Sequence, residues 1–198
     1  MHLASEEPGP KRRRHGAELK AAVLDAAWDE LREHGYAALT FAAVAQRAGT
    51  SRPVVNRHWA ARETLVRDAI IRASDRFSLV DPDTGSLGED TIALLEQLNG
   101  AFTVFAVTMT AHLAAYFEET GTTPAELRTS VIDQRWSVIE SVTRRAIERG
   151  EIDGSKLTPR IARLPYDLLR HEVLMNLEPM SSPDIREIVE TIFIPLIT

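Results

Sequence analysis

The amino-acid sequence predicts an all-α protein, and three observations support this prediction. Apolar residues recur at three- and four-residue spacing along most of the chain. No stretch alternates apolar and polar residues convincingly, and no hairpin turn of the Asn-Gly type appears. Glycines and prolines stand where helices would end or begin. We therefore expect an N-terminal three-helix domain with a helix-turn-helix, followed by a larger helical domain.

The composition indicates a soluble cytoplasmic protein without a membrane partner. The chain has 198 residues, of which 44% are hydrophobic, and this is enough to build a sizeable core. It contains no cysteine, which excludes disulfides, thiolate metal sites and cysteine nucleophiles and fits a reducing compartment. Residues 1–10 hold two glutamates and two prolines without an apolar run, so we expect neither a signal peptide nor a membrane anchor.

Residues 40–59 have the pattern of two short helices joined by a tight turn. Thr40 can cap the first helix, whose apolar residues recur at helical spacing. Gly49 tolerates the left-handed backbone of a sharp helix exit, and Ser51 can cap a second helix that holds Pro53 in its first turn. Such a pair can place its second helix in the major groove of DNA. An ordinary helical hairpin with a solvated face is the alternative interpretation.

The second of these helices has an inner and an outer face. Val55 and Trp59 are four residues apart and are expected to face inward. Arginine can bind a guanine edge through two hydrogen bonds, proline and valine can contact a thymine methyl, and polar side chains can reach phosphates. We expect base contacts from Arg52, Pro53, Val54 and His58. We expect phosphate contacts from Thr40, Asn56 and Arg57.

Residues 23–65 carry a set of positions at fixed spacing, which includes Ala26, Ala27, Gly35, Tyr36, Leu39, Thr40, Val44, Ala45, Ala48, Gly49, Ser51, Val55, Trp59 and Leu65. With these positions, the segment resembles the DNA-binding domain of the TetR/AcrR transcriptional regulators. Two positions depart from the family pattern: Asn56 replaces the usual tyrosine, and Thr50 replaces an apolar residue. Arg62 stands where the family usually has a lysine, so the resemblance implies a cationic phosphate contact there.

The charge distribution also favours DNA binding by the N-terminal part. The net charge is −6, but residues 1–62 carry ten Lys and Arg against seven Asp and Glu, whereas the remainder carries thirteen against twenty-two. A basic head on an acidic body fits a protein whose head alone contacts DNA. Residues 1–16 are expected to form a disordered arm that can reach phosphates or the minor groove through Lys11, Arg12, Arg13 and Arg14. A solubilising tail is an equally good interpretation of this run.

Two further helices complete the head and join it to the body. The first is expected over 17–34 and ends at Gly35. The second is expected over 62–79 and ends in the loop VDPDTGSLGED, whose turn chemistry indicates a boundary between head and body. We assign 1–16 to the arm, 17–62 to the DNA-binding domain and 63–198 to the regulatory and dimerisation domain, which includes the connecting helix.

The body is expected to contain helices near 88–99, 101–119, 124–150, 159–176 and 183–197. The longest begins at Pro124 and ends at Gly150. Pro165 falls inside the fourth of these patterns, so we expect that helix to be kinked or broken there.

One stretch of the body, residues 101–117, is apolar nearly all round. It is too short and too interrupted by polar residues to span a bilayer, so we expect a buried helix. The resemblance implies a ligand cavity in this domain. Its expected lining is Phe102, Phe105, Met109, His112 and Tyr116, with Trp136 from the long helix opposite. A plain core stripe with a satisfied histidine is the alternative.

The last two helices carry more apolar surface than a thin body can bury. Two such helices can form a four-helix interface with a symmetry mate, as the dimers of the family do. A two-fold dimer places its two reading helices about 34–36 Å apart, on successive major grooves of a pseudo-palindromic DNA site. The sequence therefore predicts a homodimer.

Catalytic motifs are missing from the sequence. The six histidines include no pair at metal-binding helical spacing, and nothing resembles HExxH, a phosphate loop, a dinucleotide fingerprint or a nucleophile elbow. We expect no enzyme activity, no metal and no cofactor. The sequence favours a dimeric DNA-binding repressor that is released by a small apolar or amphipathic ligand. An activator of the same fold and a helical small-molecule-binding protein without DNA binding are the alternatives.

Overall fold

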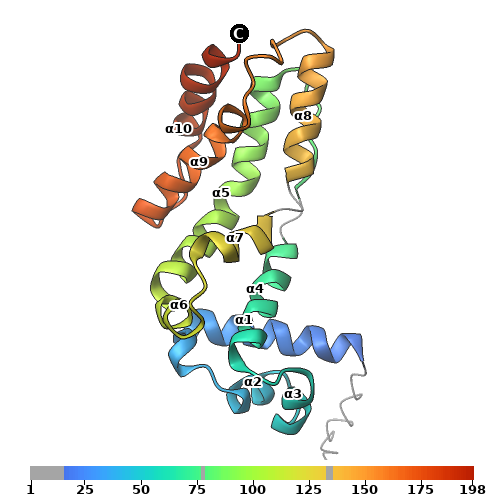
Figure 1. Cartoon of the computed structure of the whole chain (residues 1–198), viewed down its shortest axis with the longest axis vertical. Coiled ribbons are helices and arrows are strands. Elements are labelled where there is room, and N and C mark those ends of the chain that lie inside the picture. The colour runs from blue at the N-terminus through green and yellow to red at the C-terminus, as the bar shows by residue number, and fades with distance from the viewer. Residues whose placement is uncertain (1–15, 77–78, 133–135) are drawn as a thin grey trace, which may run out of the picture.

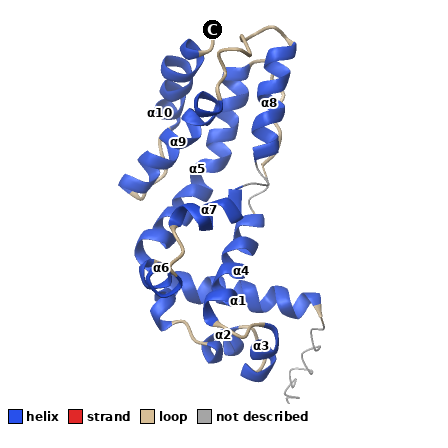
Figure 2. Cartoon of the chain, in the orientation of Figure 1, coloured by secondary structure: helices blue, strands red, loops and turns tan. Residues whose placement is uncertain are grey.

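The computed structural model describes residues 16–76, 79–132 and 136–198. All regular elements in these ranges are helices, which confirms the predicted fold class (Figure 2). The molecule is elongated, with the helix-turn-helix at one end and the C-terminus at the other (Figure 1). The predicted basic arm, Lys11 to Arg14, lies outside the described residues.

The helices follow the predicted order of head, connector and body. The head consists of α1 (Ala17–Ala38), α2 (Phe41–Arg47) and α3 (Arg52–His58), and α4 (Arg62–Asp75) leads to the body. The body consists of α5 (Leu87–His112), α6 (Ala114–Thr120), α7 (Pro124–Ile132), α8 (Trp136–Glu148), α9 (Pro159–Asn176) and α10 (Ser182–Glu187), which continues as a π-helical turn (Ile188–Phe193) and a 3-10 turn (Ile194–Leu196).

The helical path of α1 breaks at Gly35, as predicted. Gly35 has φ 75° and ψ 169°, a backbone conformation that L-residues rarely adopt. A Cβ at this position would also lie 3.3 Å from Nδ1 of His112, so α5 approaches α1 closely here. The glycine therefore redirects the chain towards α2 and admits the end of α5.

Two hydrophobic cores hold the molecule together. The first lies in the head and joins α1–α4 to Leu113, Tyr116 and Leu127 of the body. The second lies among α5, α8, α9 and the C-terminal helical segment. The buried face of α4 thus packs with the head, although the predicted division at residue 62 groups this helix with the body. The segment after α5 packs directly onto the head.

The central helix of the body is longer than predicted. Two helices divided at Gly100 were expected, but α5 runs unbroken from Leu87 to His112, so this prediction was wrong. The break falls at Leu113, which has φ −109° and ψ 1°. A glycine inside a helix costs only about 1 kcal/mol, and packing of α5 against α8 and α9 outweighs that cost.

Proline and glycine act differently in the helices that follow. The predicted helix over 124–150 appears as α7 and α8, and residues 133–135 between them lie outside the described residues. Gly150 ends α8 with φ 69°, as expected. Of the two outcomes expected at Pro165, a kink or a break, the break is absent, because α9 runs unbroken from Pro159 to Asn176. The ring removes one backbone hydrogen bond, while α9 buries Pro165, Leu169 and Val173 and packs along α5.

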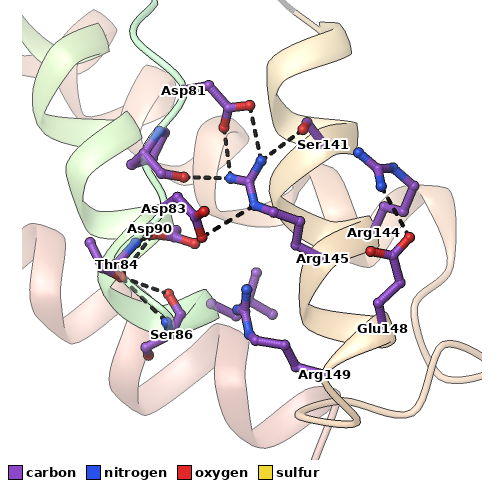
Figure 3. A network of polar contacts seen from close by, with 12 residues as sticks. Asp81, Asp83, Thr84, Ser86, Asp90, Ser141, Arg144, Arg145, Glu148 and Arg149 are labelled. Atoms are coloured by element: carbon purple, nitrogen blue, oxygen red, sulfur yellow. Dashed lines mark hydrogen bonds and ion pairs between the residues drawn. The ribbon is translucent and has the colours of Figure 1, made fainter.

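A polar network fastens the loop before α5 to α8 (Figure 3). The guanidinium of Arg145 donates to Oδ1 and Oδ2 of Asp81 at 2.7 and 3.0 Å. Buried Asp90, in the first turn of α5, accepts hydrogen bonds from the amide and hydroxyl of Thr84 at 2.7 and 2.8 Å. The hydrogen bond from Arg145 lowers the pKa of Asp81. The predicted loop is therefore held in place at both of its ends.

The length and composition of α5 would allow it to cross a membrane, and it is the one such helix in the described part of the chain. It packs against α1, α8 and α9 and lies at the centre of the body (Figure 1). Its apolar character is accounted for by this position, because a helix that is covered on several sides needs apolar residues on several sides.

Candidate functional site

The helix-turn-helix is specified by its own backbone. The hydroxyl of Thr40 accepts a hydrogen bond from the Ala43 amide at 3.2 Å, so the predicted cap is confirmed. Gly49 has φ 67°, and Thr50 donates to the Ala45 carbonyl at 2.9 Å, which closes α2 in a Schellman motif. The hydroxyl of Ser51 makes no capping hydrogen bond, contrary to prediction.

The inner face of α3 is anchored in the head core. Val55 and Trp59 are buried, as predicted from their spacing. The indole N–H of Trp59 donates to Oδ2 of Asp68 at 3.0 Å, which ties the end of α3 to α4. The packing of these two residues determines which face of α3 is turned towards the core.

An arginine clamp holds α2 on α1. Nε of Arg47 donates to Oε1 of buried Glu30 at 2.6 Å, and its NH1 nitrogen donates to Glu33 at 2.8 Å. The hydrogen bond from Arg47 lowers the pKa of Glu33. The guanidinium of Arg47 is thus paired within the head, and it fixes α2 against α1.

The outer face of α3 keeps its donors available. The exposed side chains are those of Arg52, Pro53, Asn56, Arg57 and His58, and Val54 is partly exposed. Within the described residues, neither Arg52 nor Arg57 has an ion-pair or hydrogen-bond partner. The arginines of α2 and α4 contrast with this: Arg47, Arg62, Arg67, Arg72 and Arg76 all contact carboxylates. An exposed helix face with unused guanidinium groups is suited to bases and phosphates.

Arg62, which is predicted to contact a phosphate, makes three contacts within the chain. Its NH2 nitrogen donates to Oε2 of Glu119 at 2.5 Å, and its NH1 nitrogen donates to the Tyr36 carbonyl at 3.3 Å. Its guanidinium lies 4.1 Å from the centre of the Tyr36 ring. The structure thus uses Arg62 inside the chain, where it joins α4 to α1 and α6.

Tyr36 and Glu119 complete this junction between head and body. The Tyr36 hydroxyl donates to Oε1 of Glu119 at 2.8 Å. Burial and this hydrogen bond raise the pKa of Tyr36 to about 12. Sequence reasoning missed Glu119, because it lies 57 residues from Arg62 and no local pattern connects the two.

The first turn of α1 lies beside the end of α3. The ammonium group of Lys20 is 5.8 Å from the centre of the Trp59 ring. The described chain begins at Gly16, four residues before this contact. The predicted arm therefore joins the head close to the helix that is predicted to read DNA.

The residues predicted to line a ligand cavity do not lie around one common cavity. Phe102 packs partly buried against the body core, and Phe105 packs against the head core. His112 lies against Gly35. Tyr116 is buried and lines a cavity of about 460 Å³ between α4, α6 and α7. The side chains of Met109 and Trp136 lie outside the description.

A groove between α9 and the C-terminal segment has a mixed lining, in which Leu168, Ile188 and Ile192 lie beside the carboxylates Glu172, Glu178, Asp184 and Glu187. Leu168 from α9 and Ile192 from the C-terminal segment line a depression of about 620 Å³. Ile192 is 39% exposed and Met175 is 66% exposed. The apolar residues of the last two helices are thus partly buried in the body core, and the others lie on this surface.

Known proteins share this arrangement. Residues 23–69 match the family model described as bacterial regulatory proteins, tetR family, and residues 81–192 match a tetracyclin repressor-like C-terminal domain. An HTH-type transcriptional regulator of Mycobacterium tuberculosis is 30% identical over 172 residues, which cover 85% of this chain and 82% of that protein. The DNA-binding transcriptional repressor TetR of Mycobacteroides abscessus is 25% identical over 182 residues, covering 92% and 95% of the two chains. The flavonoid-responsive regulator FrrA has a similar fold, with a TM-score of 0.62 and 17% identity over 92% of this chain and 98% of that chain.

Proposed function

The chain belongs to the TetR family of transcriptional regulators, and on that premise we propose that it is a dimeric repressor released by a small-molecule effector. Its family is one of DNA-binding regulators and not of enzymes. We place its action in the cytoplasm, where its DNA lies. The observation that carries the proposal is the exposed outer face of α3, whose arginines have no partner among the described residues.

The proposed contacts follow from the surroundings of each side chain. Base contacts are assigned to Arg52, Pro53, Val54 and His58, which stand on the outer side of α3. Phosphate contacts are assigned to Thr40, Asn56, Arg57 and the arm Lys11 to Arg14. The Thr40 hydroxyl can still donate its own hydrogen while it caps α2, because a hydroxyl accepts and donates at once. Arg62 is left out of this set because its guanidinium is used at the junction.

The dimer is proposed to form through α9 and the C-terminal segment. The groove between Leu168 and Ile192 supplies apolar surface for a partner.

Two variants with matched exposure test the dimer. Ile192 is 39% exposed on the proposed interface, and Ile147 is 42% exposed on α8. We expect Ile192→Asp to give the mass of a monomer in light scattering, and Ile147→Asp to leave a dimer. A dimeric Ile192→Asp protein, or a monomeric wild-type protein, would contradict the proposed interface.

The repressor role and the effector are supported by relatives. The Mycobacteroides abscessus relative is named a repressor, and the structural neighbour FrrA is named flavonoid-responsive. In a two-state mechanism, DNA favours the conformer whose two reading helices match adjacent grooves, and the effector favours another conformer. The effector weakens DNA binding by its difference in affinity for the two states.

The test of DNA binding compares the DNA upstream of the protein's own gene with a random duplex of equal length across a salt series. We expect the upstream DNA to be bound at least about a thousandfold more tightly than the random duplex, with a footprint of two symmetric half-sites. Equal and strongly salt-dependent binding to both duplexes would contradict specific recognition of this DNA, since charge alone produces that result.

A further inference from the structure

A cavity at the junction of head and body has the chemistry of a small-molecule site. Its volume is about 460 Å³, and it lies between the first turns of α4, the end of α6 and the start of α7. Polar side chains form most of its wall, and Tyr116 and Leu127 add ring and aliphatic surface. The phenol of Tyr116 is neutral at physiological pH, and burial raises its pKa further. The cavity is therefore a place for a hydrophilic ligand.

Two opposite charges stand on one wall of this cavity without pairing with each other. Glu63 and Arg67 are four residues apart on α4, a spacing at which glutamate and arginine often form an ion pair. Among the described residues, Arg67 pairs instead with Asp68 at 3.7 Å, and Glu63 has no ion pair. A ligand can therefore approach a carboxylate and a guanidinium on the same wall.

The other carboxylate in the wall has a structural task. Glu126 accepts a hydrogen bond from the Thr123 amide at 2.8 Å and donates its own amide to Oγ1 of Thr123 at 3.2 Å. These two bonds form a capping box that begins α7. The hydrogen bonds that the Thr123 amide and hydroxyl donate to the Glu126 carboxylate lower the pKa of Glu126. Glu63 is thus the carboxylate of the wall that can turn to a ligand without unmaking a helix cap.

We propose that this cavity is the effector site and that it binds a small zwitterion of the amino-acid type. The carboxylate of the ligand pairs with Arg67, its ammonium group pairs with Glu63, and its side chain lies against Tyr116 and Leu127. The proposal rests on the repressor function argued above. It replaces the apolar ligand expected from the α5 stripe, because the wall of this cavity carries charges of both signs.

The position of the cavity connects its ligand to the head. Tyr116 packs edge to face on Tyr36, with ring centres 5.3 Å apart, and Tyr36 belongs to the junction with Arg62 and Glu119. Glu63 follows Arg62 directly on α4. A ligand that contacts both Glu63 and Tyr116 bridges α4 and α6, the two helices that hold the head. Its binding can therefore change the orientation of α3 relative to the body.

The experiment uses the full-length protein, its upstream DNA and the common protein amino acids as probes. Calorimetry identifies the amino acid that binds most tightly, and its deaminated and decarboxylated analogues are then compared with it. We expect the zwitterion to bind at least about tenfold more tightly than either analogue and to weaken DNA binding by at least about tenfold. Binding of no amino acid below about 1 mM, or equal binding of all three forms, overturns the proposal.

Variants assign the charges and separate this proposal from the proposed function. Arg67→Ala and Glu63→Gln are expected to bind DNA like the wild type and to lose the response to the amino acid. Arg144→Ala is the control, since Arg144 forms an exposed ion pair with Glu148 on α8 and lies outside the cavity lining. A full response in Arg67→Ala overturns the proposal. Specific DNA binding without any amino-acid effect refutes this site alone, whereas amino-acid binding without specific DNA binding refutes the repressor function alone.

Discussion

Replacing Val55 by alanine tests whether α3 turns one face into the head and the other towards DNA. Val55 is fully buried, so the variant removes two methyl groups from the core. Their transfer free energy is about 1.6 kcal/mol, and a cavity that does not relax adds about 1 kcal/mol. We therefore expect the free energy of unfolding to fall by about 1.6–2.6 kcal/mol. The melting temperature should fall by about 3–10 °C for a chain of this length.

The adjacent valine provides a matched control. Val54 is partly exposed, so we expect Val54→Ala to change stability by less than about 1 kcal/mol and to reduce the preference for the upstream DNA. Urea unfolding measures the first effect, and binding to upstream and random duplexes measures the second. If Val54→Ala destabilises the protein as much as Val55→Ala does, α3 does not present the face described above.

Three further predictions concern the turn, the junction and the DNA contacts. Nothing lies within 4 Å of a Cβ added at Gly49, but its φ of 67° strains an L-residue, so Gly49→Ala should lower the free energy of unfolding in urea by about 1–2 kcal/mol. Gly100→Ala inside α5 should raise it by about 0.5–1 kcal/mol, and a rise in both variants would contradict the left-handed turn. Burial and hydrogen bonding raise the pKa of Tyr36 to about 12, above its unfolded value of about 10. The contribution of this shift to stability is therefore complete below pH 10 and is lost as the pH rises towards 12, which thermal unfolding across this range should show. A Tyr36→Phe variant that loses stability equally steeply with pH would count against this assignment. Arg52→Ala should lose about 1–3 kcal/mol of discrimination at one base pair, whereas Arg62→Ala should leave the salt dependence of DNA binding unchanged; a logarithmic slope smaller by about 0.9 in Arg62→Ala would instead place this residue on a phosphate.

Local patterns in the sequence predicted the head closely. The cap at Thr40, the left-handed Gly35 and Gly49 and the inward pair Val55 and Trp59 are all present in the structure. Each depends on neighbours within a few residues, through capping, backbone conformation or helical spacing. The candidate DNA-reading face could be predicted for the same reason, since it is the remainder of α3 once its inner face is known.

The sequence by itself determined the helical class, the family resemblance and the position of the helix that is proposed to read DNA, because periodicity and turn chemistry are local properties. Only the tertiary structure decided that Gly100 and Pro165 lie inside unbroken helices, since burial along α5 outweighs a local cost of a few kcal/mol. It also decided that Arg62 pairs with Glu119 and that the charged cavity lies beside the head. These features join groups that are far apart in the sequence, and the packing of one helix on another brings such groups together.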